Sequence, residues 1–321
     1  MKIQLLFATL LFAACTPFAA TTHMAKITVR VVDESGKPMT NVPVAAGYVD
    51  SFRSSADTWG FPEPYYKDII VPTDKHGLAV ITVYRAEQEL YYSVSDYPGY
   101  YRENGSFTFK SARIGPWQPW NPTVQLVLEA IGVQVTGYAK RIINMAIPAQ
   151  GKPLGYDLMA GDWVPPYGKG ETPDFVFQFD TKITNYLTLT FSNEGDGIQF
   201  VASSGRGLQL PRLAPADAYE SMLMKWDWME HGTNNGRPFV KGYSNYHDNA
   251  NYFFRVRTNK DTNGKIVSAL YGYIRGDVSR NLEQGKIDLN YCLNPEPNSR
   301  NMEFAPNRNL LGKPSPFKQS P

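Results

Sequence analysis

The sequence predicts an all-β protein, built as two tandem antiparallel β-sandwich domains after an N-terminal signal segment. Three observations lead to this prediction. Aromatic residues make up 13% of the 321 residues, with 20 Tyr and 17 Phe, a composition that favours strands over helices. The 26 Gly and 24 Pro are spread along the chain, which suits many turns between short strands. Segments of alternating apolar and polar residues recur in both halves of the chain.

The first residues have the features of an export signal. Lys2 gives a positive start, and residues 3–14 form an apolar run that is too short to span a bilayer as a resident helix. Residues 11–15 (Leu-Phe-Ala-Ala-Cys) resemble the lipobox of bacterial lipoproteins, in which small residues precede an acylated cysteine. This resemblance implies a signal over residues 1–15, lipidation of Cys15 and a tether over residues 16–25. Cleavage near Ala20 without lipidation is the alternative.

Both routes export the protein, either to the cell envelope, with the outer membrane as the expected place of a lipid anchor, or out of the cell. The net charge of +2 provides no long-range field for binding nucleic acid. Cys15 and Cys292 are the two cysteines, and Cys15 is acylated or removed, so we expect no intramolecular disulfide. No basic neighbour in the sequence activates Cys292, which predicts a small, partly buried side chain rather than a reactive thiol.

The first β-sandwich is predicted over residues 26–130. Residues 27–31 alternate as a half-buried strand does, and residues 33–38 form a turn. The next strand begins at residues 42–44, and Pro43 predicts an edge position for it because proline donates no ladder hydrogen bond. We expect a long loop over residues 50–71. Further strands are expected over residues 78–85, 90–95, 106–110 and 123–130.

A family resemblance covers the same region. The D-E-x-G-K-P turn at residues 33–38 and the N-V-P-V strand at 41–44 precede Asp74 and Gly77 of a T-D-x-x-G step. Together with Y-P-G-Y-Y at residues 97–101, they resemble the carboxypeptidase regulatory-like domain, a small transthyretin-like β-sandwich of exported bacterial proteins. The resemblance implies a spacer or adhesion module and no catalytic residues. Gly77 permits a left-handed turn there, and Asp74 can accept hydrogen bonds from nearby backbone.

The second, larger β-sandwich is predicted over residues 131–311, followed by a disordered tail over residues 312–321. Residues 175–179, 187–191 and 252–257 have strand patterns. The Asn263-Gly264 pair predicts a hairpin with a type I′ turn between residues 252–258 and 266–274. Pro215 and Asp217 suit the first turn of a short helix toward Met224.

This second region resembles C-terminal regions of exported bacterial proteins that carry a similar leading domain. The matching stretches are residues 156–158 with 161–163, residues 191–193 with 195–197, and residues 255–258. The resemblance implies an architecture and no activity.

No motif for zinc, for a nucleophilic serine or for phosphate binding is present, so we expect no catalytic residues, no metal and no cofactor. The acidic turns at residues 193–197 and 261–263 offer oxygen ligands that suit Ca²⁺, but ordinary hairpin turns have the same composition. Carboxylate pairs such as Asp57 with Glu63, or Asp157 with Asp162, suggest the alternative function of a glycan-active hydrolase.

Tryptophans in proline-bounded loops are the candidate ligand-binding residues. Trp117 and Trp120 share one loop, Trp59 lies in a second and Trp163 in a third. Rings held in such loops can form flat surfaces on which sugars stack, and packing inside the protein is the alternative. Trp226 and Trp228 would share one face of a strand. The sequence thus predicts a non-catalytic envelope protein, a spacer plus a β-sandwich that binds a glycan or an envelope protein.

Overall fold

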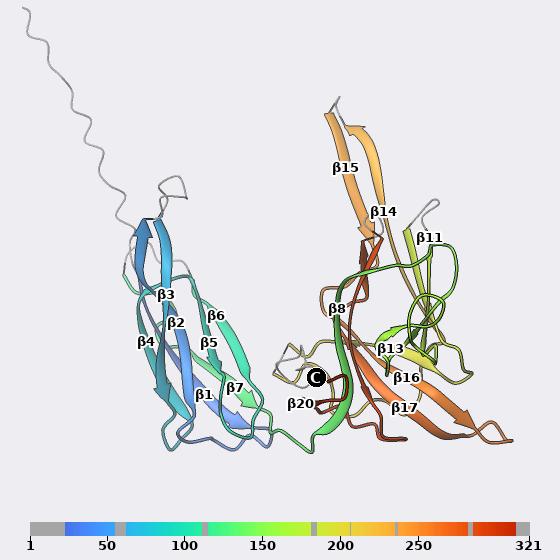
Figure 1. Cartoon of the computed structure of the whole chain (residues 1–321). Coiled ribbons are helices and arrows are strands. Elements are labelled where there is room, and N and C mark those ends of the chain that lie inside the picture. The colour runs from blue at the N-terminus through green and yellow to red at the C-terminus, as the bar shows by residue number, and fades with distance from the viewer. Residues whose placement is uncertain are drawn as a thin grey trace, which may run out of the picture. The chain divides into compact units, whose positions relative to one another are not determined.

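The computed structural model describes residues 23–54, 62–110, 115–180, 185–205, 207–234, 237–281 and 285–312 (Figure 1). In these ranges every regular element is a β-strand, which confirms the all-β prediction. The same ranges contain no apolar helix of membrane-spanning length. The chain divides into two compact units. Of the described residues, the first unit takes those up to Val32, Pro38–Val94 and Gly105–Leu126, and the second takes the others.

Strands β1 to β7 lie wholly or mostly in the first unit and form two sheets. Their order is β4-β1-β7 in one sheet and β3-β2-β5-β6 in the other. Alternate residues of β1, among them Ile27 and Val29, are fully buried, as the period-two pattern predicts. The strands are β1 (His23–Asp33), β2 (Pro43–Ser54), β3 (Pro62–Pro72), β4 (Leu78–Ala86), β5 (Glu89–Val94), β6 (Glu103–Thr108) and β7 (Thr123–Leu128).

Two predictions for this unit are wrong. Most of the expected loop over residues 50–71 is strand, because β2 and β3 pair from Pro43 opposite Pro72 to Ser54 opposite Pro62. Strand β2 lies between β3 and β5, so it is not an edge strand. Pro43 is compatible with this position because it is the first residue of the strand, where a missing N–H costs little.

Three turns of the chain share one Asp-x-x-Gly construction. In each turn the aspartate side chain accepts the N–H groups two and four residues later, as Asp74 does from His76 (2.8 Å) and Leu78 (2.9 Å). Gly77 has a φ of 74°, which confirms the left-handed turn expected there. Asp33 and Asp261 accept the corresponding bonds in the other two turns.

The predicted hairpin around residues 261–264 is confirmed, but its turn type is different. Among the central residues of this turn, Gly264 has a positive φ of 79° and Asn263 does not. A type I′ turn needs positive φ at both central residues, so this turn is not of that type. The N–H of Gly264 donates to the Asp261 carbonyl and the N–H of Asp261 to the Lys265 carbonyl, as in a type I turn followed by a left-handed glycine.

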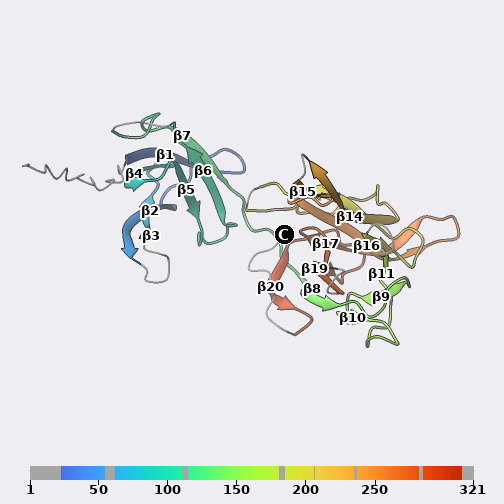
Figure 2. The ribbon, with the colours of Figure 1, turned by 90° about the horizontal axis from the view of Figure 1, so that it is seen from above.

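The second unit consists of two sheets and the loops around them. The front sheet has the order β10-β9-β11-β12-β14-β15, and the back sheet has the order β13-β16-β17-β19-β8-β20 with β18 beside β19. Figure 2 shows β16, β17 and β19 side by side. The front strands are β9 (Leu154–Asp157), β10 (Asp162–Trp163), β11 (Phe175–Asp180), β12 (Asn185–Thr190), β14 (Met222–Asn234) and β15 (Arg237–Ser244). The back strands are β8 (Val135–Ala146), β13 (Gly197–Ala202), β16 (Ala250–Lys260), β17 (Ile266–Arg275), β18 (Ser279–Asn281), β19 (Lys286–Asn294) and β20 (Phe304–Asn309).

Aromatic side chains fill the space between these two sheets. Phe175, Phe177 and Phe179 of β11 face Tyr252 and Phe254 of β16 in one buried cluster. A second buried cluster covers the opposite side of the back sheet and includes Phe253, Tyr271, Tyr273, Cys292 and Phe304. The central back strands are therefore buried on both faces, and β17 is correspondingly apolar over most of its length.

The predicted helix starting near Pro215 is wrong. Residues 215–221 form bends and a bridge between Glu220 and Ile198, and β14 begins at Met222. Ala218 has a φ of 63°, a left-handed conformation that a right-handed helix cannot contain. Cys292 is buried, as expected, and burial raises the pKa of its thiol, so the reactive thiolate is disfavoured.

Candidate functional site

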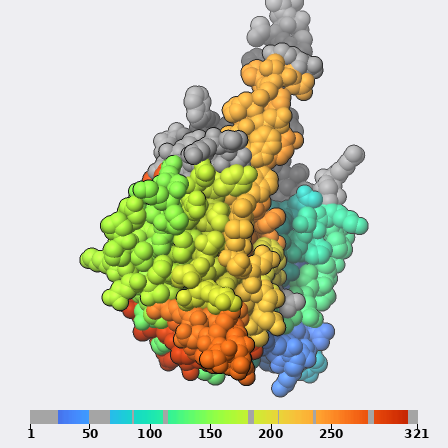
Figure 3. Space-filling view, turned by 90° about the vertical axis from the view of Figure 1, so that its right-hand side faces the viewer, coloured from blue at the N-terminus to red at the C-terminus, as the bar shows by residue number. Residues whose placement is uncertain are grey.

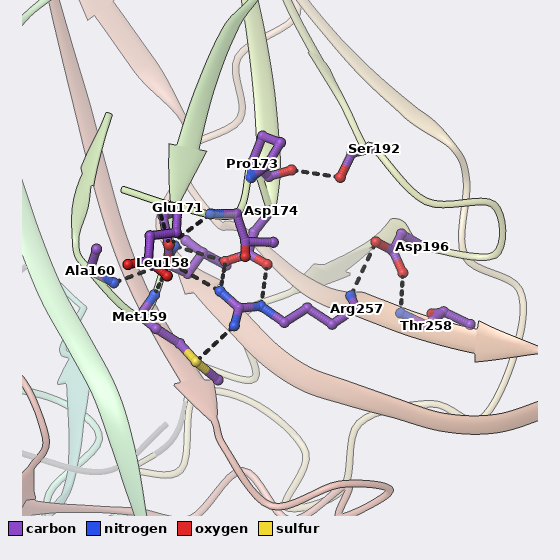
Figure 4. Close-up of polar contacts among 12 residues, drawn as sticks. Leu158, Met159, Ala160, Glu171, Pro173, Asp174, Ser192, Asp196, Arg257 and Thr258 are labelled. Carbon is purple, nitrogen blue, oxygen red and sulfur yellow. Dashed lines mark hydrogen bonds and ion pairs between the residues drawn. The ribbon is translucent and has the colours of Figure 1, made fainter. Parts of the chain in front are cut away.

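Three buried aspartates and one arginine form the main polar cluster of the second unit (Figure 4). Asp157 ends β9, Asp174 precedes β11, Asp196 precedes β13, and Arg257 lies in β16. Asp157, Asp174 and Asp196 are only 4%, 1% and 4% exposed. Asp157, Asp196 and Arg257 come from the three stretches in which the second region resembles other exported bacterial proteins. Asp174 lies outside those stretches.

Arg257 connects two of the aspartates. Its Nε and Nη2 donate to the two carboxylate oxygens of Asp174 at 2.8 and 2.9 Å, and Nη2 also donates to Asp157 Oδ1 at 3.0 Å. Such bidentate pairing fixes the guanidinium plane as well as its charge. A fourth contact, from Nη1 to Met159 Sδ at 3.0 Å, further fixes the position of the side chain.

Asp196 holds the backbone that carries Arg257. Arg257 has a φ of 54°, an uncommon conformation for a non-glycine residue, at an irregularity in the β16–β17 pairing. The N–H groups of Arg257 and Thr258 donate to the two oxygens of Asp196 at 3.1 and 2.8 Å. The aspartate therefore replaces the ladder partners that a bulge lacks.

The pKa values of the three aspartates differ in direction. Burial acts to raise the pKa of Asp157, but backbone N–H groups, among them those of Thr172 and Glu171, lower it more, so its pKa lies below the usual value. Burial raises the pKa of Asp174 above the usual value although Arg257 opposes the shift. Burial likewise raises the pKa of Asp196.

The bonds of the cluster indicate a structural role. Asp157 lies directly opposite Asp162 in the β9–β10 pairing, the arrangement suggested for a hydrolase. However, Asp157 accepts four backbone N–H groups and Arg257, while Asp162 accepts the N–H groups of Trp163 and Lys169. These carboxylates are occupied by the protein itself. For the pair Asp57 and Glu63, the side chains lie outside the described part of the chain.

The candidate calcium turns use their acidic groups in the same way. Glu194 pairs with Lys260 at 2.7 Å, and the Asp196 oxygens bind backbone N–H groups of the bulge. The Asp261 carboxylate accepts two N–H groups of its own turn. The ranges that the structure describes contain no group of three His, Cys, Asp or Glu side chains arranged to hold a metal ion.

The predicted aromatic residues are distributed over the two units. Trp117 is 8% exposed and Trp163 is 5% exposed, and Trp163 packs edge-on against Tyr156 (5.2 Å between ring centroids) and Phe177 (5.8 Å). Their burial favours the alternative of packing inside the protein, because a packed ring has no free face for a ligand. Trp120 is 40% exposed, so its predicted role in binding stays open. Trp59 lies outside the described residues.

The sequence reasoning missed an exposed apolar surface of the second unit, which we call the outer face. It is the side of β12, β14 and β15 that points away from the buried cluster between the front and back sheets. Leu187 and Leu189 of β12 are buried, and Leu223 of β14 packs against them, so the alternate residues of both strands point outward. The outer face comprises Tyr186, Thr188, Thr190, Met222, Met224, Trp226, Trp228, Glu230, Phe239, Lys241 and Tyr243.

Large apolar side chains of the outer face are open to solvent. Trp228, Tyr186, Met222 and Met224 are 40%, 40%, 45% and 42% exposed, and Phe239 is 37% exposed. Beyond β12, strands β14 and β15 continue as a two-stranded ribbon, and Figure 3 shows it projecting past the rest of the second unit. The shared parity of Trp226 and Trp228 was the one signal of this surface in the sequence.

A ring stack occupies the ribbon. Trp228 lies opposite Tyr243, and the two rings stack with centroids 4.5 Å apart and planes 10° from parallel. Lys241 Nζ lies over the Tyr243 ring at 4.7 Å, and the Tyr243 hydroxyl donates to Glu230 at 2.8 Å. One face of the Trp228 indole is thus covered by Tyr243, and Trp228 is still 40% exposed.

No protein-family model matches the chain, and no curated protein matches it. Solved structures give only weak likenesses. A streptococcal ancillary pilin is 12% identical with a TM-score of 0.20, covering 73% of this chain and 53% of the pilin, so the chain spans about half of that protein. The shaft pilin SpaA of Lactobacillus rhamnosus GG is 10% identical with a TM-score of 0.22, covering 74% and 89%. The major pilin subunit BcpA of Bacillus cereus is 10% identical with a TM-score of 0.21, covering 83% and 95%.

Likenesses this weak carry no conclusion about the fold or the function of this chain. The resemblance of residues 26–130 to the carboxypeptidase regulatory-like domain stays a prediction, since no family model matches.

Proposed function

We propose that this chain is an exported, non-catalytic binding protein of the cell envelope. In this proposal the sandwich of residues 26–130 is a spacer, and the second unit binds a glycan or a protein through the outer face. The signal-like residues 1–14 support export, and the lipobox-like residues 11–15 support a membrane anchor at Cys15. The supporting observation for binding is the outer face itself.

The exposure of this surface needs a physical explanation. Single exposed apolar residues are ordinary, but a contiguous group of them is typical of interaction sites. Met222, Met224 and Trp228 follow one another on the same side of one strand, with Tyr186 beside them. Exposing these side chains costs free energy in the isolated protein, and binding a ligand recovers it.

A binding role also agrees with the state of the acidic residues. The Asp157, Asp174 and Asp196 carboxylates accept hydrogen bonds from backbone amides or from Arg257. General acid–base work requires a carboxyl group within reach of a substrate, and these groups are buried. A binding function therefore agrees with the burial and hydrogen bonding of these carboxylates better than a hydrolase function does.

The test is binding to isolated cell envelopes of the producing organism. Full-length protein with Cys15→Ser, which lacks the acylation site, should bind saturably. The double variant Met222→Ser/Trp228→Ala should lose affinity by about tenfold or more, because central aromatic contacts dominate interfaces.

The matched control is Met229→Ser/Val240→Ser. These two side chains are 64% and 61% exposed and lie on the opposite side of the ribbon. The control should bind as the parent does. Equal binding of both double variants, or no binding by the parent, contradicts the proposed function.

A further inference from the structure

We infer that the outer face binds a neutral, linear polysaccharide, an inference that rests on the proposed function and specifies its ligand. The argument uses the arrangement of the aromatic rings, the chemistry of the polar groups between them, and the exposed edge of β15.

The rings form a row along β14. Tyr186 lies opposite Trp226, and Tyr243 lies opposite Trp228, so two cross-strand aromatic pairs follow each other on the same face. Residues two apart on a strand are separated by about 6.8 Å along its axis. Such a row offers successive flat surfaces to a chain of sugar rings, whereas a single small molecule would occupy one of them.

Trp228 is the best-defined of these surfaces. Tyr243 stacks on it, and Tyr243 is itself held by Lys241 and Glu230, so the indole plane is supported before any ligand arrives. A prearranged ring costs little conformational entropy on binding. The exposed part of the indole can receive the C–H face of a sugar, a contact of the same kind as other stacking on aromatic rings.

The polar groups of this face favour a neutral partner. Thr188 and Thr190 of β12 and Gln178 of β11 point to the same side as the aromatic row and carry hydroxyl or amide groups. The charged groups have both signs, as with Glu230 opposite Lys241. A face with hydroxyls, amides and balanced charge complements the hydroxyl groups of a neutral glycan and offers no attraction to a strongly anionic one.

The edge of the ribbon disfavours strand addition by another protein chain. Strand β15 ends the front sheet, and it contains Pro238 and Lys241. Proline and lysine in edge strands hinder pairing with further strands. The aromatic face, rather than the backbone edge, is therefore the surface offered to a ligand.

The experiment is affinity electrophoresis of the full chain with Cys15→Ser. The native gels contain hydroxyethyl cellulose, mixed-linkage β-glucan, galactomannan or arabinoxylan as neutral probes, and alginate or polygalacturonate as anionic probes. The parent should be retarded in at least one neutral gel and in neither anionic gel. Trp228→Ala should weaken that retardation about fivefold or more.

Two further variants separate loss of binding from loss of structure. Met222→Thr/Met224→Thr keeps the ring stack and should also weaken retardation, while Met229→Ser on the opposite side should not. Melting curves of all variants should agree within a few degrees. Retardation in none of the neutral gels, or equal retardation of parent and Trp228→Ala, overturns the inference.

These failures are distinguishable from failure of the proposed function. If envelope binding still depends on the outer face while no neutral glycan retards the protein, the assignment of a neutral polysaccharide is wrong and the proposed binding function is retained. If retardation occurs only in the anionic gels, the argument from charge is wrong. Absence of envelope binding contradicts the function itself.

Discussion

Lys225 Nζ lies 2.7 Å from a carboxylate oxygen of Asp277, and the two side chains are only 3% and 10% exposed. Lys225 belongs to β14 of the front sheet, and Asp277 follows β17 of the back sheet. Asp277 also accepts the His247 N–H at 3.1 Å and the Tyr252 hydroxyl at 2.8 Å. This contact therefore ties the base of the β14–β15 ribbon to the sheet behind it.

Replacement of Asp277 by alanine should strongly destabilise the second unit. The change leaves the buried Lys225 charge without the opposite charge of the Asp277 carboxylate, which costs about 3–5 kcal/mol of unfolding free energy. Urea denaturation measures the loss. Glu194→Ala is the control: it breaks the Lys260 pair, whose carboxylate is 91% exposed, and should cost far less unfolding free energy because water screens exposed ion pairs. Similar costs for both variants would contradict the role assigned to burial.

Asp157 should make the stability of the protein depend on pH. Its pKa is lowered in the folded state, so it stabilises the fold at pH values above its unfolded pKa of about 3.9. That contribution is lost as the pH falls through the lowered folded value. Asp157→Asn should therefore be less stable than the parent at neutral pH, and the difference should shrink in acid.

Urea denaturation at a series of pH values checks this expectation, with Asp217→Asn as the control on an exposed aspartate. Burial raises the pKa of Asp174 and Asp196, so these groups act in the opposite direction. They favour the fold as the pH falls through their raised pKa values. Because Asp174 and Asp196 are present in both the parent and Asp157→Asn, the difference in unfolding free energy between the two proteins reports the contribution of Asp157. A constant difference across the pH series would contradict it.

Trp163 and Trp120 should respond differently to truncation. Trp163→Ala removes a buried ring and should cost about 3–5 kcal/mol of unfolding free energy. Trp120→Ala should change stability by about 0.5 kcal/mol or less, because surface substitutions have small effects. Denaturation curves distinguish the two. A large loss at Trp120 would show that its ring supports the fold, and its candidate role in binding would lose support.

Lipid anchoring should be visible in the mass of the mature protein. Protein extracted from membranes should carry a diacylglyceryl-sized increment at Cys15, and Cys15→Ser should release it into the soluble fraction. A mature N-terminus at Thr21 would instead indicate ordinary cleavage.

The predicted boundary near residue 131 can be tested with a fragment of residues 25–131. This piece should unfold cooperatively on its own, since a sandwich with its own core is an independent folding unit. Circular dichroism and amide exchange are suitable measurements. An unstructured fragment would place the boundary elsewhere.

The features that the sequence predicted are local ones. The hairpin at Asp261 and the turn at Asp74 depend on residues within five positions of each other, so their patterns are visible in a single chain. The predicted turn type at Asn263 was wrong because the Asp261 carboxylate accepts the N–H groups of Asn263 and Lys265, and these hydrogen bonds stabilise a different turn from the one that an Asn-Gly pair favours. Pro43 was misassigned because the neighbours of a strand in a sheet cannot be identified from its own residues.

The clusters of the second unit could not be predicted in the same way. Arg257 reaches Asp174 and Asp157 across 83 and 100 residues of chain, and no local pattern announces such a contact. Asp174 lies in no motif at all. The outer face was missed because the pairing of β12 with β14 brings Tyr186 beside Trp226, and that register depends on the whole sheet.

The two buried clusters of the second unit share the strand β16. Phe253 and Phe254 are adjacent residues, yet the first belongs to one cluster and the second to the other. Because neither cluster can loosen without disturbing this strand, the two should melt in a single transition. Damage on either side of the back sheet would then be transmitted to the other, and the second unit would be lost as a whole rather than layer by layer.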